Sequence, residues 1–398
     1  MNGIKEITLS LASVTVFKNI TGSDVVKKLI SFLECEGETV KRVELYSAFV
    51  SSLYENGCDL SKYIRRRLFE DENEYVILAS QNKEIHPCME KAVKEELKIF
   101  TALSKVSFDT FRKSVDFEGY LPEFENTAFD FEKEYEYKLS RLTKDGYGIY
   151  SRYSMFNIKS DGEITPLRSA DKITADDLIG YEAEREKVIA NTKALILGKP
   201  AANVLLCGDA GTGKSSTVKA VANMFSSEGV RLIEVQKEQL MSLPLIMEEI
   251  NHNPLKFIIF IDDLSYNNSE EGFGTLKAIL EGSASAKAHN AVIYATSNRR
   301  HLVKESFSDR EGDDIHRNDT MQEIISLSER FGIQVTFNRP DKKTYLDIVH
   351  HLADAAGIEY DAAKIDLAAE RFVLSRGSRS ASAARQFIDN IISGNIIL

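Results

Sequence analysis

The sequence predicts a protein of the α/β class, in which a parallel sheet flanked by helices follows a mostly helical N-terminal region. Three observations carry this prediction. From about residue 178, β-branched and aromatic runs alternate with helical patterns, as in parallel sheets. A glycine-rich loop lies between one of these apolar runs and a helical pattern. Earlier, residues 1–145 carry apolar positions at helical spacing, and 398 residues are too many for a single core.

The expected domain organisation follows from this change of pattern. Residues 1–172 are predicted to form a mostly helical domain with a short β-hairpin near 147–167, and this domain is the candidate partner-binding adaptor. Residues 173–340 are predicted to form a nucleotide-binding α/β core. Its sheet is expected to contain five parallel strands, at Val204–Cys207, Val230–Val235, Phe257–Ile261, Ala291–Ala295 and Ile333–Phe337.

The composition is that of an ordinary globular protein, with 43% hydrophobic and 28% charged residues. The net charge of −11 leaves room for a small nucleic-acid-binding patch but indicates none. The longest uncharged apolar run, Phe257–Ile261, is too short to cross a bilayer, and the N-terminus lacks the pattern of a signal peptide. The four cysteines lack CxxC spacing. We therefore expect a cytoplasmic protein without a membrane partner.

The strongest motif is GDAGTGKSS at Gly208–Ser216, which fits the phosphate-binding pattern G-x-x-x-x-G-K-[ST]. Glycines allow the backbone N–H groups to face a chain of phosphates, and the helix that follows directs its positive end towards the same anion. Lys214 is expected to reach the β and γ phosphates, and Ser215 to ligate Mg²⁺. The predicted nucleotide-binding residues of this motif are Gly208, Asp209, Ala210, Gly211, Thr212, Gly213, Lys214, Ser215 and Ser216.

Two further apolar runs end in polar residues. The run FIIFI precedes Asp262 and Asp263, and AVIYATS precedes Asn298. Ligand sites of open α/β sheets lie at the carboxyl ends of the strands, so these side chains are expected beside the phosphate loop. Asp262 is predicted to hold Mg²⁺, and Asp263 to polarise a water near the γ-phosphate. Asn298 is predicted to hold the same water or a γ-phosphate oxygen.

In this order and spacing, the three motifs resemble those of the AAA+ ATPases. The resemblance covers residues 175–398 and implies a hexamer-forming ATPase that uses ATP and Mg²⁺. LSERFGIQVTFNRPDKKTYLDIV, from Leu327, is similar to the segment that carries the arginine finger in that superfamily, with Arg330 in the matching place. The resemblance also implies that the backbone at Ile179 and Gly180 meets the adenine, and that residues 341–398 form a helical lid.

The wider resemblance is to two groups within the superfamily. The Asp-Asp pair, the RFG segment and the lid are similar to the replication-initiator and helicase-loader branch. The whole chain resembles a bacterial family of predicted AAA+ ATPases of unassigned function, which shares FSDREGDDIH and SLSERFG. The resemblance implies ATP as the nucleotide, because the sequence shows no guanine-specific motif.

The sequence departs from the superfamily at two positions. Asp263 stands where glutamate is usual and is one methylene shorter, which implies a closer water or slow turnover. The superfamily carries an arginine, called sensor 2, at the start of the last lid helix. In this sequence it is either Arg379 or Arg385. Helical spacing favours Arg385. If Arg385 is the sensor-2 arginine, Phe387 and Ile391 fall on a face of the helix that can pack against the lid.

The sequence therefore predicts an ATPase that remodels, loads or moves an unidentified partner, with the nucleotide at the interfaces of a homo-oligomer. Two alternatives remain. The first is an ATP-dependent assembly switch or scaffold with slow turnover. The second is a protein similar to DNA-replication loaders.

Overall fold

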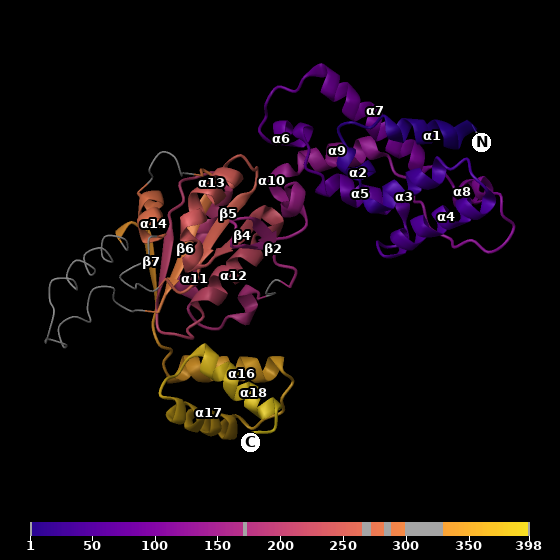
Figure 1. The fold of residues 1–398 in the computed structure, drawn as a ribbon. Coiled ribbons are helices and arrows are strands. Elements are labelled where there is room, and N and C mark those ends of the chain that lie inside the picture. Colours follow the sequence, from indigo (N-terminus) through magenta and orange to yellow (C-terminus); the bar gives the residue numbers. More distant parts are fainter. Residues whose placement is uncertain (1, 170–172, 265–271, 282–287, 299–328, 397–398) are drawn as a thin grey trace. The chain divides into compact units, whose positions relative to one another are not determined.

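The computed structural model describes residues 2–169, 173–264, 272–281, 288–298 and 329–396. The chain divides into two compact units, Met1–Arg152 and Tyr153–Leu398 (Figure 1). No helix among the described residues is long and apolar enough to cross a membrane.

The first unit is helical. Its larger helices bury one apolar face each. Aromatic rings meet edge to face in the shared core, for example the ring of Phe17, which precedes α2, with those of Phe100 and Tyr135. The helices are α1 (Asn2–Ala12), α2 (Lys18–Thr21), α3 (Asp24–Leu33), α4 (Thr39–Tyr54), α5 (Leu60–Glu70), α6 (Glu74–Ser80), α7 (Pro87–Ser104), α8 (Phe108–Val115), α9 (Phe131–Ser140) and α10 (Leu142–Asp145), followed by the 3₁₀ turn η1 (Gly148–Ser151).

The second unit is built on one sheet with the strand order β2-β1-β4-β5-β6-β3-β7. All neighbours pair in parallel except β1 and β2. The strands are β1 (Met155–Ile158), β2 (Ile164–Pro166), β3 (Val204–Gly208), β4 (Val230–Val235), β5 (Lys256–Ile261), β6 (Ala291–Ser297) and β7 (Ile333–Phe337).

The sheet corrects one part of the sequence-based prediction. The sequence predicts five parallel strands and places the hairpin in the N-terminal domain. The hairpin instead forms β1 and β2 and extends the core sheet to seven strands, because β1 pairs with β4 in parallel. Met155, Phe156 and Ile158 are buried, so both faces of β1 are covered except at Asn157. This pairing satisfies backbone groups that β4 would otherwise leave open at the sheet edge.

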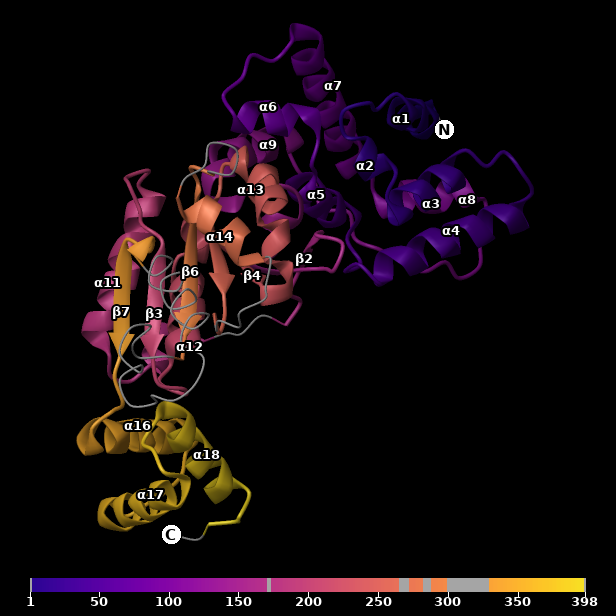
Figure 2. The same cartoon turned by 60° about the vertical axis from the view of Figure 1, so that its left-hand side comes forward.

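Helices cover both faces of this sheet (Figures 1 and 2). On one face, α11 (Glu182–Ile196) and α12 (Lys214–Met224) pack on alternate strand residues such as Val204, Phe260 and Tyr294. The α13 helix (Leu243–Asn251) packs against β6 and α14 (Gly272–Leu280). The remaining short turns are η2 (Ala175–Asp177), η3 (Ser226–Glu228) and η4 (Lys237–Ser242).

Three C-terminal helices follow the sheet and share a small core of their own that includes Tyr345, Ala369 and Phe387. They are α16 (Lys342–Ala355), α17 (Ala362–Arg376) and α18 (Ala381–Ile392). Each begins with a side-chain cap, from Asp341, Asp361 and Ser380 respectively. These helices, yellow in Figure 1, lie where the sequence predicts a lid, and we call them the lid.

Candidate nucleotide-binding site

The phosphate loop leaves β3 at Gly208 and enters α12 at Lys214. Gly208 has φ +144°, and a Cβ on it would lie 2.1 Å from the Phe337 carbonyl oxygen, so no other residue fits there. Gly211 has φ +75° and is crowded by Ser380 and Ser382 of the lid. Gly213 has φ +91° and precedes the helix. The loop thus keeps its backbone shape because its three glycines occupy conformations that side chains disfavour.

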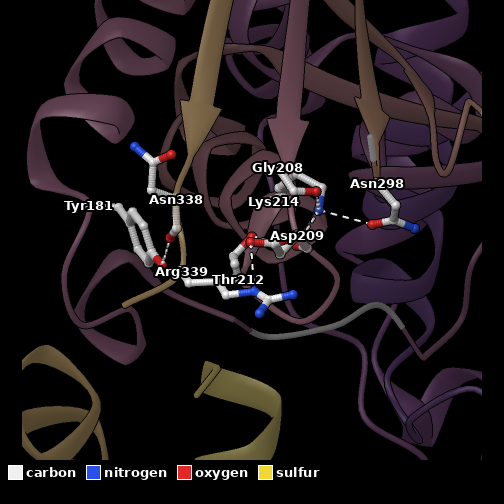
Figure 3. Close-up of polar contacts among 8 residues, drawn as sticks. All are labelled: Tyr181, Gly208, Asp209, Thr212, Lys214, Asn298, Asn338 and Arg339. Carbon is white, nitrogen blue, oxygen red and sulfur yellow. Dashed lines mark hydrogen bonds and ion pairs between the residues drawn. The ribbon is translucent and has the colours of Figure 1, made fainter. Parts of the chain in front are cut away.

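Lys214 is the buried cation of the site, with 5% of its surface exposed. Its Nζ donates to the carbonyl oxygens of Gly208 at 3.0 Å and Asp209 at 2.8 Å, and to Asn298 Oδ1 at 3.0 Å (Figure 3). Burial lowers the pKa of Lys214, and the carboxylates of Asp262 and Asp209 partly oppose this shift. An incoming anion would therefore meet a poorly solvated ammonium group, which favours binding.

Asp262 directly follows β5 and accepts hydrogen bonds from hydroxyl groups of two other elements. Its Oδ1 accepts hydrogen bonds from Ser215 Oγ on α12 and from Thr296 Oγ1 on β6, both at 2.6 Å. A carboxylate and hydroxyl groups in contact are oxygen donors of the kind that Mg²⁺ prefers. Ser215 and Asp262, the predicted Mg²⁺ ligands, could therefore hold the ion, and the Thr296 hydroxyl group orients the Asp262 carboxylate.

Asp263 and Asn298 form a second polar pair beside the first. Asn298 Nδ2 donates to Asp263 Oδ1 at 2.8 Å, while Asn298 Oδ1 accepts from Lys214. The Asp263 backbone is left-handed, with φ +51°, and its N–H donates to Thr296 Oγ1 at 2.8 Å. Aspartate tolerates this conformation better than most residues. The Asn298 amide therefore joins the phosphate-loop lysine to the candidate base.

These groups line a cavity of about 470 Å³, a volume typical of small-molecule sites. Most of the predicted site residues face it: Ile179, Ala210, Gly211, Thr212, Gly213, Lys214, Ser215, Ser216, Asp262, Asp263, Asn298 and Arg385. Gly180, Gly208 and Asp209 do not line it. The Gly180 carbonyl accepts from Arg185, and the Asp209 carboxylate accepts from Arg339. Ile348, His351 and Leu352 of the first C-terminal helix also line the cavity.

The two sensor-2 candidates differ in their surroundings. Arg379 forms a two-pronged ion pair with Glu370, at 3.1 and 2.8 Å, and does not line the cavity. Arg385 faces the cavity from the second turn of α18. Its charge contributes to lowering the pKa of Asp177, another cavity residue, although hydrogen bonds from Thr174 are the main cause of that shift. The structure thus places Arg385, not Arg379, beside the site.

Arg330, the predicted arginine finger, does not line this cavity. Arg330 precedes β7, and its Nη2 lies 2.9 Å from Glu281 Oε1, next to the end of α14. Both side chains are well exposed, at 41% and 36%. Within one chain, Arg330 is therefore paired with Glu281 and does not reach the phosphate loop.

Sequence reasoning missed several residues of the site. Thr296 lies next to the polar strand end that the sequence marks, but its hydrogen bonds to Asp262 and Asp263 depend on the alignment of two strands. Tyr181 lines the cavity, and its hydroxyl donates to the Asn338 carbonyl. His351 enters from a helix far along the chain. No local motif marks these residues, because each reaches the site through the tertiary fold.

The sheet and the site together define the class of this protein. The strand that carries the phosphate loop, β3, lies between β6 and β7, and β5 with its two aspartates lies next to β6. Three helices follow the sheet, and two of them, α16 and α18, line the same cavity. This strand order, loop position and set of C-terminal helices are those of the AAA+ fold, as the sequence predicted.

The chain belongs to the family described as "Protein of unknown function (DUF815)", whose model matches residues 151–395. No curated protein matches the chain. Among solved structures, RuvB of Thermotoga maritima, a Holliday junction branch migration motor, is 15% identical, with 55% of this chain and 71% of RuvB covered and a TM-score of 0.35. A point variant of the same motor is 16% identical, with the same coverage and TM-score. These likenesses are weak, and the class rests on the strand order and the site.

Proposed function

We propose that this protein binds ATP with Mg²⁺ and hydrolyses it, and that nucleotide turnover drives the movement, loading or remodelling of a partner. One observation carries the proposal. Lys214 and Ser215 begin α12, Asp262 and Asp263 follow β5, and Asn298 follows β6, and all of them converge on one cavity. Each group has the chemistry that a nucleoside triphosphate requires, namely a cation for phosphate, oxygens for a metal and a carboxylate for water.

The site fits the magnesium nucleotide on structural grounds. The loop glycines leave space where side chains would obstruct the backbone, and the buried Lys214 ammonium favours an anion. When bound to Ser215 and Asp262, Mg²⁺ would neutralise phosphate charge. Lys214 would leave its carbonyl acceptors for the β and γ phosphates. Asp263, oriented by Asn298, would accept the proton of the attacking water.

Two arginines, Arg385 and Arg330, are proposed to stabilise the charge that develops on the phosphates. Arg385 would contact the phosphates within the same chain, since it faces the cavity. Arg330 would serve the nucleotide of a neighbouring subunit, as the AAA+ class uses its arginine finger. We therefore propose a ring-forming homo-oligomer, most simply a hexamer. The helical unit Met1–Arg152 would select the partner.

A switch with slow turnover is the second candidate, and the geometry of Asp263 favours it. The carboxylate is one methylene shorter than glutamate, and it is tied to Asn298 at 2.8 Å. Water must approach closer to this carboxylate, so the assembled ATP state would persist. Turnover at saturating ATP, beside light scattering with ADP and with ATP, separates the candidates. Fast turnover that does not depend on a partner counts against the switch.

Steady-state hydrolysis and ATP binding test the proposal directly. Lys214→Ala should abolish ATP binding, whereas Asp263→Asn should retain binding and lose turnover. The matched control is Lys219→Ala, because Lys219 lies on the same helix, pairs with Glu234 at 3.5 Å and is outside the cavity. It should behave as the wild type. Equal hydrolysis by the wild type, Lys214→Ala and Asp263→Asn would overturn the enzymatic assignment.

A further inference from the structure

The segment between the sheet and the lid is fixed to the core at successive residues. At the end of β7, Phe337 pairs with Gly208 in the sheet, and its ring lies 5.1 Å from that of Tyr181. The next residue, Asn338, accepts a hydrogen bond from the Tyr181 hydroxyl. Arg339 then binds Asp209, and the first lid helix begins three residues later (Figure 3). We call residues 337–341 the hinge.

Asp209 connects the hinge to the phosphate loop through two different groups. Its carboxylate Oδ2 accepts from Arg339 Nε at 3.0 Å. Its carbonyl accepts from Lys214 Nζ at 2.8 Å and from Thr212 Oγ1 at 2.9 Å. The side chain therefore points to the hinge while the backbone points to the phosphate site. Any movement of Arg339 acts on a residue that the phosphate-binding lysine also contacts.

The first turn of the last lid helix contacts the same loop. Ser382, in the first turn of α18, donates its backbone N–H to the Gly211 carbonyl at 3.2 Å. A Cβ on Gly211 would lie 2.9 Å from the Ser382 Cβ, so the helix and the loop are in close contact. Asp209 thus contacts the hinge at Arg339, and Gly211 contacts the start of the last lid helix at Ser382.

We propose that the Asp209–Arg339 ion pair couples the phosphate loop to the lid, and that Arg339 is a positioning residue that controls how long the nucleotide stays bound. This inference rests on the proposed function, because it requires a nucleotide between the loop and the lid. Arg339 is held by Asp209 and does not line the cavity, so it acts through that aspartate. Without the pair, the hinge loses its ion pair with the phosphate loop, so the lid opens more often.

The size of the effect follows from the exposure of the pair. Arg339 is 55% exposed and Asp209 is 21% exposed, so solvent screens their attraction. Pairs of this kind contribute up to about 1 kcal/mol, which corresponds to roughly a fivefold change in an equilibrium constant. We therefore expect nucleotide dissociation to become about two to five times faster when the pair is broken.

The test is a double-mutant cycle on the full chain with Arg339→Gln, Asp209→Asn and the double variant. Displacement of a fluorescent ATP analogue in a stopped-flow instrument gives the dissociation rate. Each single variant should be about two to five times faster than the wild type, and the double variant no faster than the singles. Arg339→Lys should restore part of the loss. Lys342→Gln is the matched control, because Lys342 follows the hinge but pairs with Glu370, 3.8 Å away.

A second readout needs no nucleotide. Hydrogen exchange of peptides that cover the hinge and the phosphate loop should be at least twofold faster in Arg339→Gln than in the wild type or Lys342→Gln. Unchanged dissociation and unchanged exchange in Arg339→Gln would overturn the coupling, as would effects of the single variants that simply multiply. If the wild type binds no ATP, the proposed function fails, while the exchange measurement still decides whether Arg339 ties the hinge to the loop.

Discussion

The substitution Gly208→Ala tests whether the phosphate loop is fixed by backbone geometry. Gly208 is the last residue of β3, and its parallel partner in β7 is Phe337. A Cβ at this position would lie 2.1 Å from the Phe337 carbonyl oxygen, well inside the 3.0 Å that such contacts require. The φ of +144° is also strained for any residue with a side chain. To relieve this steric clash, the end of β3 would have to separate from β7.

The cost can be estimated from these two effects. Backbone strain contributes about 1–3 kcal/mol, and overpacking contributes about 1–3 kcal/mol more. The middle of the combined range is about 4 kcal/mol. For a cooperative unit of this size the midpoint of thermal unfolding falls about 2–4 °C per kcal/mol, so we expect a fall of about 8–16 °C. ATP binding should be lost as well, because the Gly208 carbonyl is one of the acceptors that position Lys214.

Calorimetry of the full chain measures this effect, and Gly357→Ala is the matched control. Gly357 also has a positive φ, +68°, but a Cβ on it would meet no atom within 4 Å, and the residue lies outside the cavity. Its substitution should cost about 1 kcal/mol from backbone strain alone, or a fall of about 2–4 °C. If Gly208→Ala unfolds within about 2 °C of Gly357→Ala and still binds ATP, the steric argument is wrong.

Three further predictions follow from the site and its neighbours. Burial raises the pKa of Cys207 to about 11, so thiol reagents at about pH 8 should label the exposed cysteines of the native protein and spare Cys207 until it unfolds. Arg385→Ala should lower the maximal rate of ATP hydrolysis by about tenfold or more, because Arg385 faces the cavity. Arg379→Ala should lower the stability of the lid and leave that rate near the wild-type value. The reverse pattern would make Arg379 the sensor-2 arginine. Glu281→Gln should release Arg330 and shift light scattering with ATP towards larger assemblies at lower protein concentration, while unchanged assembly would show that the Glu281 ion pair does not restrain the finger.

The sequence by itself determined the parts of the site that depend on local order along the chain. The phosphate loop could be predicted because its glycines, lysine and serine must follow one another for the backbone to curve around phosphates. Asp262, Asp263 and Asn298 could be predicted because apolar strands end directly before them, and parallel strands bring their carboxyl ends together. The five parallel strands could be predicted because each is a run of β-branched or aromatic residues.

Only the tertiary structure decided which distant residues meet. The short hairpin at 155–166 alternates like an independent element, and its pairing with β4 depends on an open sheet edge that no local pattern reports. Arg379 and Arg385 lie six residues apart, and only the packing of the lid turns one towards Glu370 and the other into the cavity. Arg339 meets Asp209 across 130 residues. Contacts of this range depend on how the chain closes in space, which residue spacing along the sequence does not specify.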